Sequence, residues 1–127
     1  MTLMDLCNLS KQETKLPVYP VTFPPTVVDC LKLEVTAGEA VAGGIDRITV
    51  QIMSKAKHPA KAEELIQQVK SKMNFTDKDY KEHNIILCKP FNEVFYVGET
   101  DTHCHIFAID LQLVIDTDIQ GAQLTHE

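Results

Sequence analysis

The apolar pattern of residues 43–73 changes half-way along, and this change constrains the fold more than any other feature. In its first half Ile48, Val50 and Ile52 alternate with polar residues, which is the two-residue period of a strand with one buried face. In its second half apolar residues recur at the spacing of an amphipathic helix, and Pro59 suits the first turn of that helix. We therefore predict a strand packed by the helix that follows it. The apolar stripe of the helix consists of Ala62, Leu65, Ile66, Val69 and Met73.

Four further stretches have the pattern of strands. Residues 27–35 and 103–116 alternate between apolar and polar side chains, residues 85–88 are apolar throughout and are expected in the interior, and residues 94–97 form a short run. The element order is helix or arm, strand, strand, helix, strand, strand, strand. This order predicts an α+β fold, in which a mostly antiparallel β-sheet has one main α-helix packed on one face.

The other segments are predicted to connect or flank these elements. Residues 36–44 contain three glycines and are predicted to form a projecting loop, and residues 74–84 are predicted to be turn-like with one short helical turn. We divide the chain into residues 1–24, a short N-terminal helix or arm with a Pro-rich connection, residues 25–116, the α+β domain, and residues 117–127, a flexible tail.

Charge and composition exclude several classes of function. Twelve basic and eighteen acidic side chains give a net charge of -6, so attraction to a phosphate backbone cannot dominate the surface. No apolar run approaches the roughly 20 residues that span a bilayer, and the N-terminus lacks the pattern of a secretion signal, so we expect a cytosolic protein and no membrane contact. The four cysteines lie far apart without a Cys-x-x-Cys pair, and we expect them to be reduced core residues.

His103 and His105 are the one pair of residues whose types suit a metal site. Alternation along a strand places both imidazoles on one face, and a third ligand would have to come from His83, Glu99 or Asp101. The alternative interpretation, which we favour, is that both histidines are partly exposed at the start of a strand. The sequence contains no phosphate-binding glycine motif, nucleophile elbow or zinc-protease motif. We therefore expect no catalytic, cofactor-binding or metal-binding residue and no cofactor.

The last predicted strand has an unusual second face. Ile106, Ala108 and Val114 lie there among polar residues, and a half-apolar surface of this kind is typical of one that is covered part of the time. We expect a subunit contact at this face.

Three segments carry a resemblance to a known family. They are Phe-Pro-Pro-Thr-Val-Val-Asp-Cys-Leu at residues 23–31, Gly-Ile-Asp-Arg-Ile-Thr-Val-Gln-Ile at residues 44–52 with the helix after it, and Val-Gly-Glu-Thr-Asp at residues 97–101 before the closing strand. Together they resemble the minor capsid or tail terminator proteins of long, non-contractile-tailed bacteriophages, over about residues 16–116. The resemblance implies a structural virion protein of the tail or neck, assembled in the host cytoplasm, and no enzyme.

In such proteins a hexameric ring caps the tail tube, ends its polymerisation and presents its other side to the head-completion proteins. The resemblance thus implies a homo-oligomer whose partners are the tail tube protein and a head-completion or connector protein. DNA would pass through the ring without specific binding, which suits the acidic balance. On this interpretation the assembly surface would be formed by polar residues that share strands with core residues but face away from them: Arg47, Thr49, Gln51, Asp110 and Gln112. Three alternatives stay open: another head-tail connector protein, a small metal-dependent enzyme using His103 and His105, and a regulatory or ligand-binding α+β module.

Overall fold

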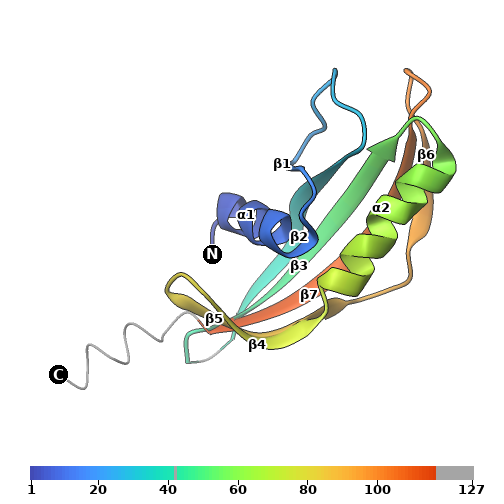
Figure 1. Cartoon of the computed structure of the whole chain (residues 1–127). Helices are drawn as coiled ribbons and strands as arrows, with labels where there is room; N and C mark the ends of the chain where they lie inside the picture. The colour runs from blue at the N-terminus through green and yellow to red at the C-terminus, as the bar shows by residue number, and fades with distance from the viewer. Residues whose placement is uncertain (42, 117–127) are drawn as a thin grey trace.

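The computed structural model describes residues 1–41 and 43–116, so the predicted tail at residues 117–127 lies outside the described residues. All seven strands of the described chain form one sheet with the order β1-β2-β3-β7-β5-β4, and β6 also pairs with β7. Every pairing is antiparallel except that of β1 with β2. Both helices lie on one face of the sheet (Figure 1). The predicted α+β fold is confirmed, with a second helix beside the main one. The elements are α1 (Leu3–Thr14), β1 (Val18–Pro20), β2 (Cys30–Val41), β3 (Ile45–Ala56), α2 (Pro59–Lys72), β4 (Phe75–Tyr80), β5 (His83–Pro90), β6 (Phe95–Glu99) and β7 (His105–Asp116).

The strand and helix at the centre of the sequence fold as predicted. β3 pairs with β2 on one side and with β7 along its whole length on the other. At the start of α2, the Nδ1 atom of His58 accepts a hydrogen bond from the backbone N–H of Ala60 at 3.1 Å, which satisfies a donor that the first turn leaves free. The apolar stripe of α2 is buried in one core with the sheet residues that face it: Val50, Ile52, Ile109, Leu111, Leu113 and Ile115.

α1 lies within residues 1–24, for which the sequence predicted a short helix or arm. It has 12 residues and begins with a capping box: the backbone N–H of Asp5 donates to Thr2 Oγ1 at 3.1 Å, and the N–H of Thr2 donates to the Asp5 carboxylate at 3.0 Å. Leu6 and Leu9 are buried in the same core as α2. At 12 and 14 residues, neither helix of the described chain is long and apolar enough to cross a membrane.

Two ion pairs join α1 to the hairpin of β4 and β5, which lies below α1 in Figure 1. Lys81 pairs with Asp5 at 2.8 Å, and Lys78 pairs with Glu13. The hydrogen bond from Lys81 is the main cause that holds the pKa of Asp5 well below its usual range. α1 is thus held by apolar burial on its inner side and by charge at the hairpin.

The prediction of a projecting loop at residues 36–44 was wrong for residues 36–41, which form the second half of β2. A bulge shifts the register between Val35 and Ala37, and pairing then continues to the partners Val41 and Ile45. Backbone pairing with β3 outweighs the low strand preference of a stretch rich in alanine and glycine. The chain reverses at Gly43 and Gly44, whose φ angles of 80° and 76° favour glycine.

The helical turn predicted within residues 74–84 was also wrong, because residues 75–80 form β4. β4 pairs with β5 from Phe75 opposite Cys88 to Tyr80 opposite His83, and this ladder supplies the backbone partners that a polar segment lacks in isolation. In β5, Ile86 is exposed although the sequence placed it in the interior, because the register with β7 shifts between Ile85 and Leu87.

All four cysteines are free and buried, as the sequence predicted. Burial raises the pKa of the Cys7 and Cys30 thiols and raises the pKa of Cys88 to about 12. These thiols therefore remain protonated at neutral pH, as expected of small core residues.

Candidate assembly surfaces

The face of the sheet opposite the helices, which we call the open face, presents the five residues predicted as an assembly surface. Thr49 on β3 lies opposite Gln112 on β7, and Gln51 lies opposite Asp110. Arg47 forms an ion pair with Glu39 of β2 at 3.7 Å, with both side chains at least half exposed. The structure thus brings all five residues together on one surface, and their role in assembly stays a prediction.

Asp110 is bonded within the chain through both carboxylate oxygens. The Nε2 atom of Gln51 donates to Oδ1 at 3.1 Å, and the Nδ2 atom of Asn92 donates to Oδ2 at 2.7 Å. The backbone N–H of Asp110 donates to Asn92 Oδ1 at 3.1 Å, and the N–H of Phe91 donates to the Asp110 carbonyl at 2.7 Å. These bonds hold the connection between β5 and β6 against β7. A substitution at Asp110 therefore disturbs the fold as well as the surface.

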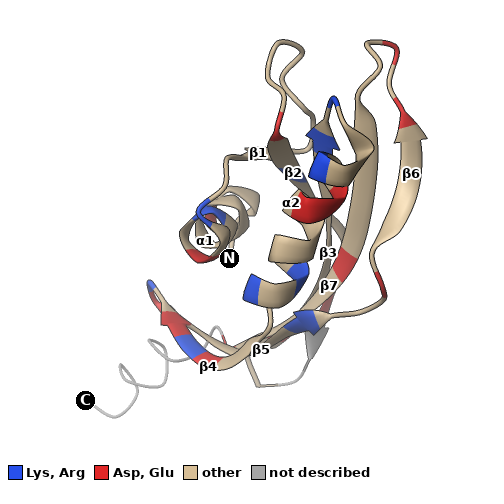
Figure 2. Cartoon of the chain, turned by 45° about the vertical axis from the view of Figure 1, so that its right-hand side comes forward, with Lys and Arg blue, Asp and Glu red and all other residues tan. Residues whose placement is uncertain are grey.

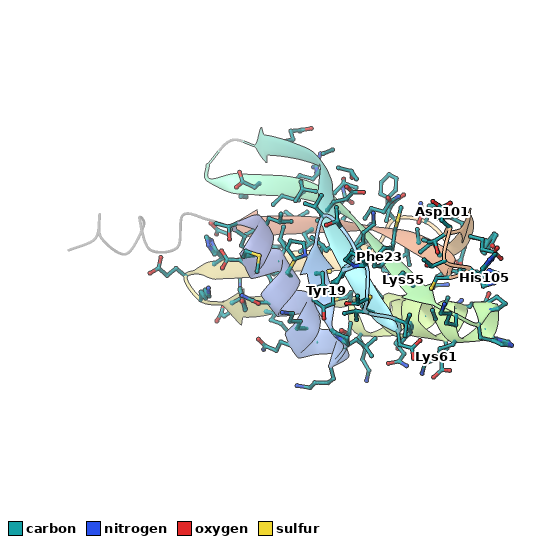
Figure 3. The ribbon with its side chains drawn as sticks, turned by 90° about the horizontal axis from the view of Figure 1, so that it is seen from above. Tyr19, Phe23, Lys55, Lys61, Asp101 and His105 are labelled. Atoms are coloured by element: carbon teal, nitrogen blue, oxygen red, sulfur yellow. The ribbon has the colours of Figure 1, made fainter. Side chains whose placement is uncertain are left out.

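One end of the open face is covered by the chain itself. The ammonium of Lys55 donates to the carbonyl of Pro24 at 3.0 Å and lies 5.3 Å from the ring centroid of Phe23, so Phe23 and Pro24 lie over this end. Figure 3 shows Phe23 and Lys55 next to each other in the view from above. Ile106, the cross-strand partner of Lys55, is 7% exposed, and Ala108 is fully buried. A subunit contact, which the sequence suggested for this face, is therefore not needed to bury these two residues.

His103 and His105 both contact the carboxylate of Glu99. His103 Nδ1 lies 3.2 Å from Oε2, and His105 Nε2 lies 3.5 Å from Oε1. His105 Nδ1 is also 3.0 Å from the hydroxyl of Tyr96. His103 precedes β7 in a turn with a φ of 63° and is mostly exposed, so the strand alternation does not extend to it. Within residues 1–41 and 43–116, no group of three or more His, Cys, Asp or Glu side chains is arranged to hold a metal ion.

β6 presents an apolar strand edge that the sequence did not single out. One side of β6 pairs with β7, and no strand of the described residues pairs with its other side. Phe95, Tyr96 and Val97 are 39%, 50% and 48% exposed, and Phe91 just before them is 63% exposed. Figure 2 shows that acidic residues mark both ends of β6 with no charge between them. The sequence signal was a run of aromatic and β-branched residues in a segment too short to show which side is covered.

Comparisons with known proteins give a likeness of fold. No model of a known protein family matches the sequence, and no curated protein matches it. The fold is similar to that of a chain in a solved structure described as the virion of a native gene transfer agent particle. The two chains superpose with a TM-score of 0.57 and are 10% identical, and the match covers 85% of this chain and 84% of that chain. The likeness therefore spans nearly the whole of both chains.

Proposed function

We propose that this protein is a structural virion component that acts as a tail terminator: copies form a ring that caps the tail tube, ends its polymerisation and joins the tail to the head-completion complex. The observation that carries the proposal is the likeness of fold to a chain of a phage-like particle over most of both chains. The resemblance of residues 16–116 to tail terminator proteins supports the same class of protein. It rests on the sequence segments 23–31, 44–52 and 97–101.

The surface chemistry supports assembly over catalysis. The open face carries polar side chains on strands whose other face forms the core, and the sheet has edges that no described strand covers. A sheet edge can pair with a neighbouring copy, and a contact between two different patches closes into a ring when the rotation between copies fits. The net charge of -6 suits a ring through which DNA passes without adhering.

Electron microscopy of the purified protein, alone and mixed with tail tubes, tests the proposal. We expect rings of six copies and decoration of one end of each tube, with tubes no longer growing from the decorated end. A protein that stays monomeric and leaves both tube ends bare would overturn the proposal. Decoration of the head and not of the tube would favour the other head-tail connector role.

The predicted assembly surface is best tested at Arg47, because Asp110 also supports the fold. Arg47→Glu places an acidic side chain beside Glu39 on the open face and is expected to weaken ring formation or tube capping. Lys61→Glu is the matched control, because it makes the same change of charge at an exposed position on α2, on the opposite side of the sheet. Equal ring formation and equal capping by the two variants would contradict a role for this part of the open face.

A further inference from the structure

Two strand edges that no other strand of residues 1–41 and 43–116 covers lie at opposite sides of the central strands. One is the outer edge of β6, and the other is the outer edge of β2 over residues 34–41, because β1 covers β2 only at Leu31, Lys32 and Leu33. Two other edges of the described sheet are protected: β4 has Asp77, Lys78 and Asp79 in its middle, and β1 is three residues long and ends in Pro20. The β6 edge and the second half of β2 have a bulge each, but neither has a charged residue or a proline at its centre.

From these two edges we infer that the β6 edge of one copy pairs with the second half of β2 of the next copy. This inference rests on the proposed ring and names the contact that builds it. A second copy is the occupant because each copy offers both halves of the contact, one on each side of the same sheet. In such pairing the sheet of one copy continues into the sheet of the next. The contact is head-to-tail, which is the kind of contact that generates a ring when the rotation between copies closes.

Strand direction agrees with this pairing. β6 is antiparallel to β7, β7 to β3, and β3 to β2, so β2 runs opposite to β6. A neighbouring copy that keeps the same strand direction therefore presents its β2 antiparallel to β6. β6 pairs with β7 near His105–Ala108, whereas residues 34–41 of β2 lie across β3 from the other end of β7. The joined sheet would be staggered, as sheets that close into barrels are.

The side chains of the two edges differ in size. The β6 edge presents Phe95, Tyr96 and Val97, whereas the second half of β2 presents Thr36, Ala37 and Gly38, all exposed. Nothing within the chain requires glycine at Gly38: its φ is not positive, and a Cβ built there meets no atom within 4 Å. Glycine inside a strand often marks a close approach of another backbone. The small side chains at the β2 edge thus leave room for the large side chains at the β6 edge to pack beside them.

Charge argues against pairing of β6 with itself. Glu93 and Glu99 lie at the two ends of the β6 edge. Glu93 pairs with Lys70 at 2.6 Å, whereas Glu99 pairs with no Lys or Arg among the described residues, so two such edges side by side would bring a second carboxylate of this kind to the contact. The second half of β2 contains Glu34 and Glu39, which are balanced by Lys32 just before it and Arg47 beside it. The β2 edge is therefore close to neutral and repels the acidic ends of β6 less than a second β6 would.

Cysteine cross-linking between singly substituted copies tests the contact. The four native cysteines are buried, so exposed thiols can be introduced one at a time as Val97→Cys and Gly38→Cys. We expect an oxidised mixture of the two variants to give a covalent dimer, neither variant alone to give one, and the double variant to give a ladder up to the size of the ring. Ile86→Cys, exposed on β5, mixed with Gly38→Cys is the matched control and is expected to give no dimer.

The outcomes separate this inference from the proposed function. Rings without a cross-link between Val97→Cys and Gly38→Cys would overturn the inference and leave the ring standing. Dimers of Val97→Cys alone would overturn it in favour of pairing between two β6 strands. A chain that is monomeric alone but needs Val97 to bind tail tubes would overturn it in favour of the tube protein as occupant. A chain that neither assembles nor binds tubes would overturn both proposals.

Gly38→Val provides a second test that does not depend on disulfide chemistry. Valine suits an exposed strand position with an ordinary φ, so the unfolding midpoint of the monomer is expected to stay the same or rise. The added side chain would occupy the face of β2 beside which a large side chain of β6 packs in this pairing, and ring formation is expected to be weakened. Rings that form as well as those of the wild-type chain would overturn the inference.

Discussion

Asp5 connects the start of α1 to the hairpin of β4 and β5, and Asp5→Asn tests how the N-terminal helix is held. Its carboxylate accepts hydrogen bonds from the backbone N–H of Thr2 at 3.0 Å and from the ammonium of Lys81 at 2.8 Å. Asparagine keeps a similar shape and one acceptor oxygen but carries no charge. The substitution therefore removes the charge with little change in packing.

Two contributions set the size of the effect. Weakening the reciprocal bonds of the capping box costs about 0.5 kcal/mol or more, and losing a negative charge in the first helical turn costs roughly 0.3–1 kcal/mol. Lys81 is exposed, so water screens its ion pair with Asp5, and the cap makes the larger contribution. We expect Asp5→Asn to lower the free energy of unfolding at pH 7 by about 1 kcal/mol, which is roughly 3–6 °C in Tm for a chain of this length.

The pH dependence follows from the pKa of Asp5. Hydrogen bonds from Lys81 and then from the Thr2 backbone lower this pKa in the folded chain below its usual value of 3.8. Because the folded-state pKa is the lower one, the charged carboxylate stabilises the fold above pH 3.8, and this stabilisation is lost as the pH falls below that value. The difference between wild-type and Asp5→Asn chains is therefore expected to be constant between about pH 7 and 5 and to shrink below pH 4.

Thermal melts at one protein concentration measure this difference, since assembly would shift Tm by mass action. Asp101→Asn is the matched control, because it makes the same change of charge in the exposed turn between β6 and β7. Its Tm is expected to stay close to that of the wild-type chain. The reasoning would be refuted if Asp5→Asn had the same Tm as the wild-type chain at pH 7. It would also be refuted if the difference in Tm were as large at pH 2.5 as at pH 7.

Three further predictions concern the core, the covered end of the open face and the thiols. Ile52→Ala is expected to lower the free energy of unfolding, measured in urea, by about 2–5 kcal/mol, because Ile52 is buried. Val28→Ala, at an exposed position, is expected to lower it by less than about 0.5 kcal/mol, and similar losses in the two variants would contradict the assigned core. Lys55→Met removes the bond to the Pro24 carbonyl and should speed hydrogen exchange in residues 21–29 while α2 stays protected; unchanged exchange in the loop would contradict the anchoring role of Lys55. The four buried thiols should react with a disulfide reagent at pH 8 only after unfolding, and fast reaction of the native chain would show that a cysteine is accessible.

Regular side-chain patterns made much of the fold predictable. The alternation of Ile48, Val50 and Ile52 identified β3 and the face it buries, and the helical spacing of the residues of α2 identified its buried stripe. The same alternation placed Arg47, Thr49 and Gln51 on the open face before their neighbours on β7 were known. These predictions succeeded because a half-buried strand or helix must repeat its apolar residues with the period of its own geometry.

The sequence misled where the backbone, and not the side chains, decides the structure. Residues 36–41 and 75–80 lack a strand pattern, yet both are strands because a partner strand is beside them. Asp110 lies on the open face, and its role in assembly stays a prediction; its bonds to Asn92 and Gln51, which join segments far apart in the chain, could not be predicted. No local pattern reports such contacts.

By itself, the sequence determined the class of fold, the central strand with its helix, the buried cysteines and which polar residues face away from the core. Only the tertiary structure decided that Phe23 and Pro24 cover one end of the open face and that Asp110 is held within the chain. It also decided that no strand of the described residues covers the outer edge of β6 or of the second half of β2. The physical reason is that side-chain periodicity is a local property, whereas the exposure of a strand edge depends on which other strands reach it.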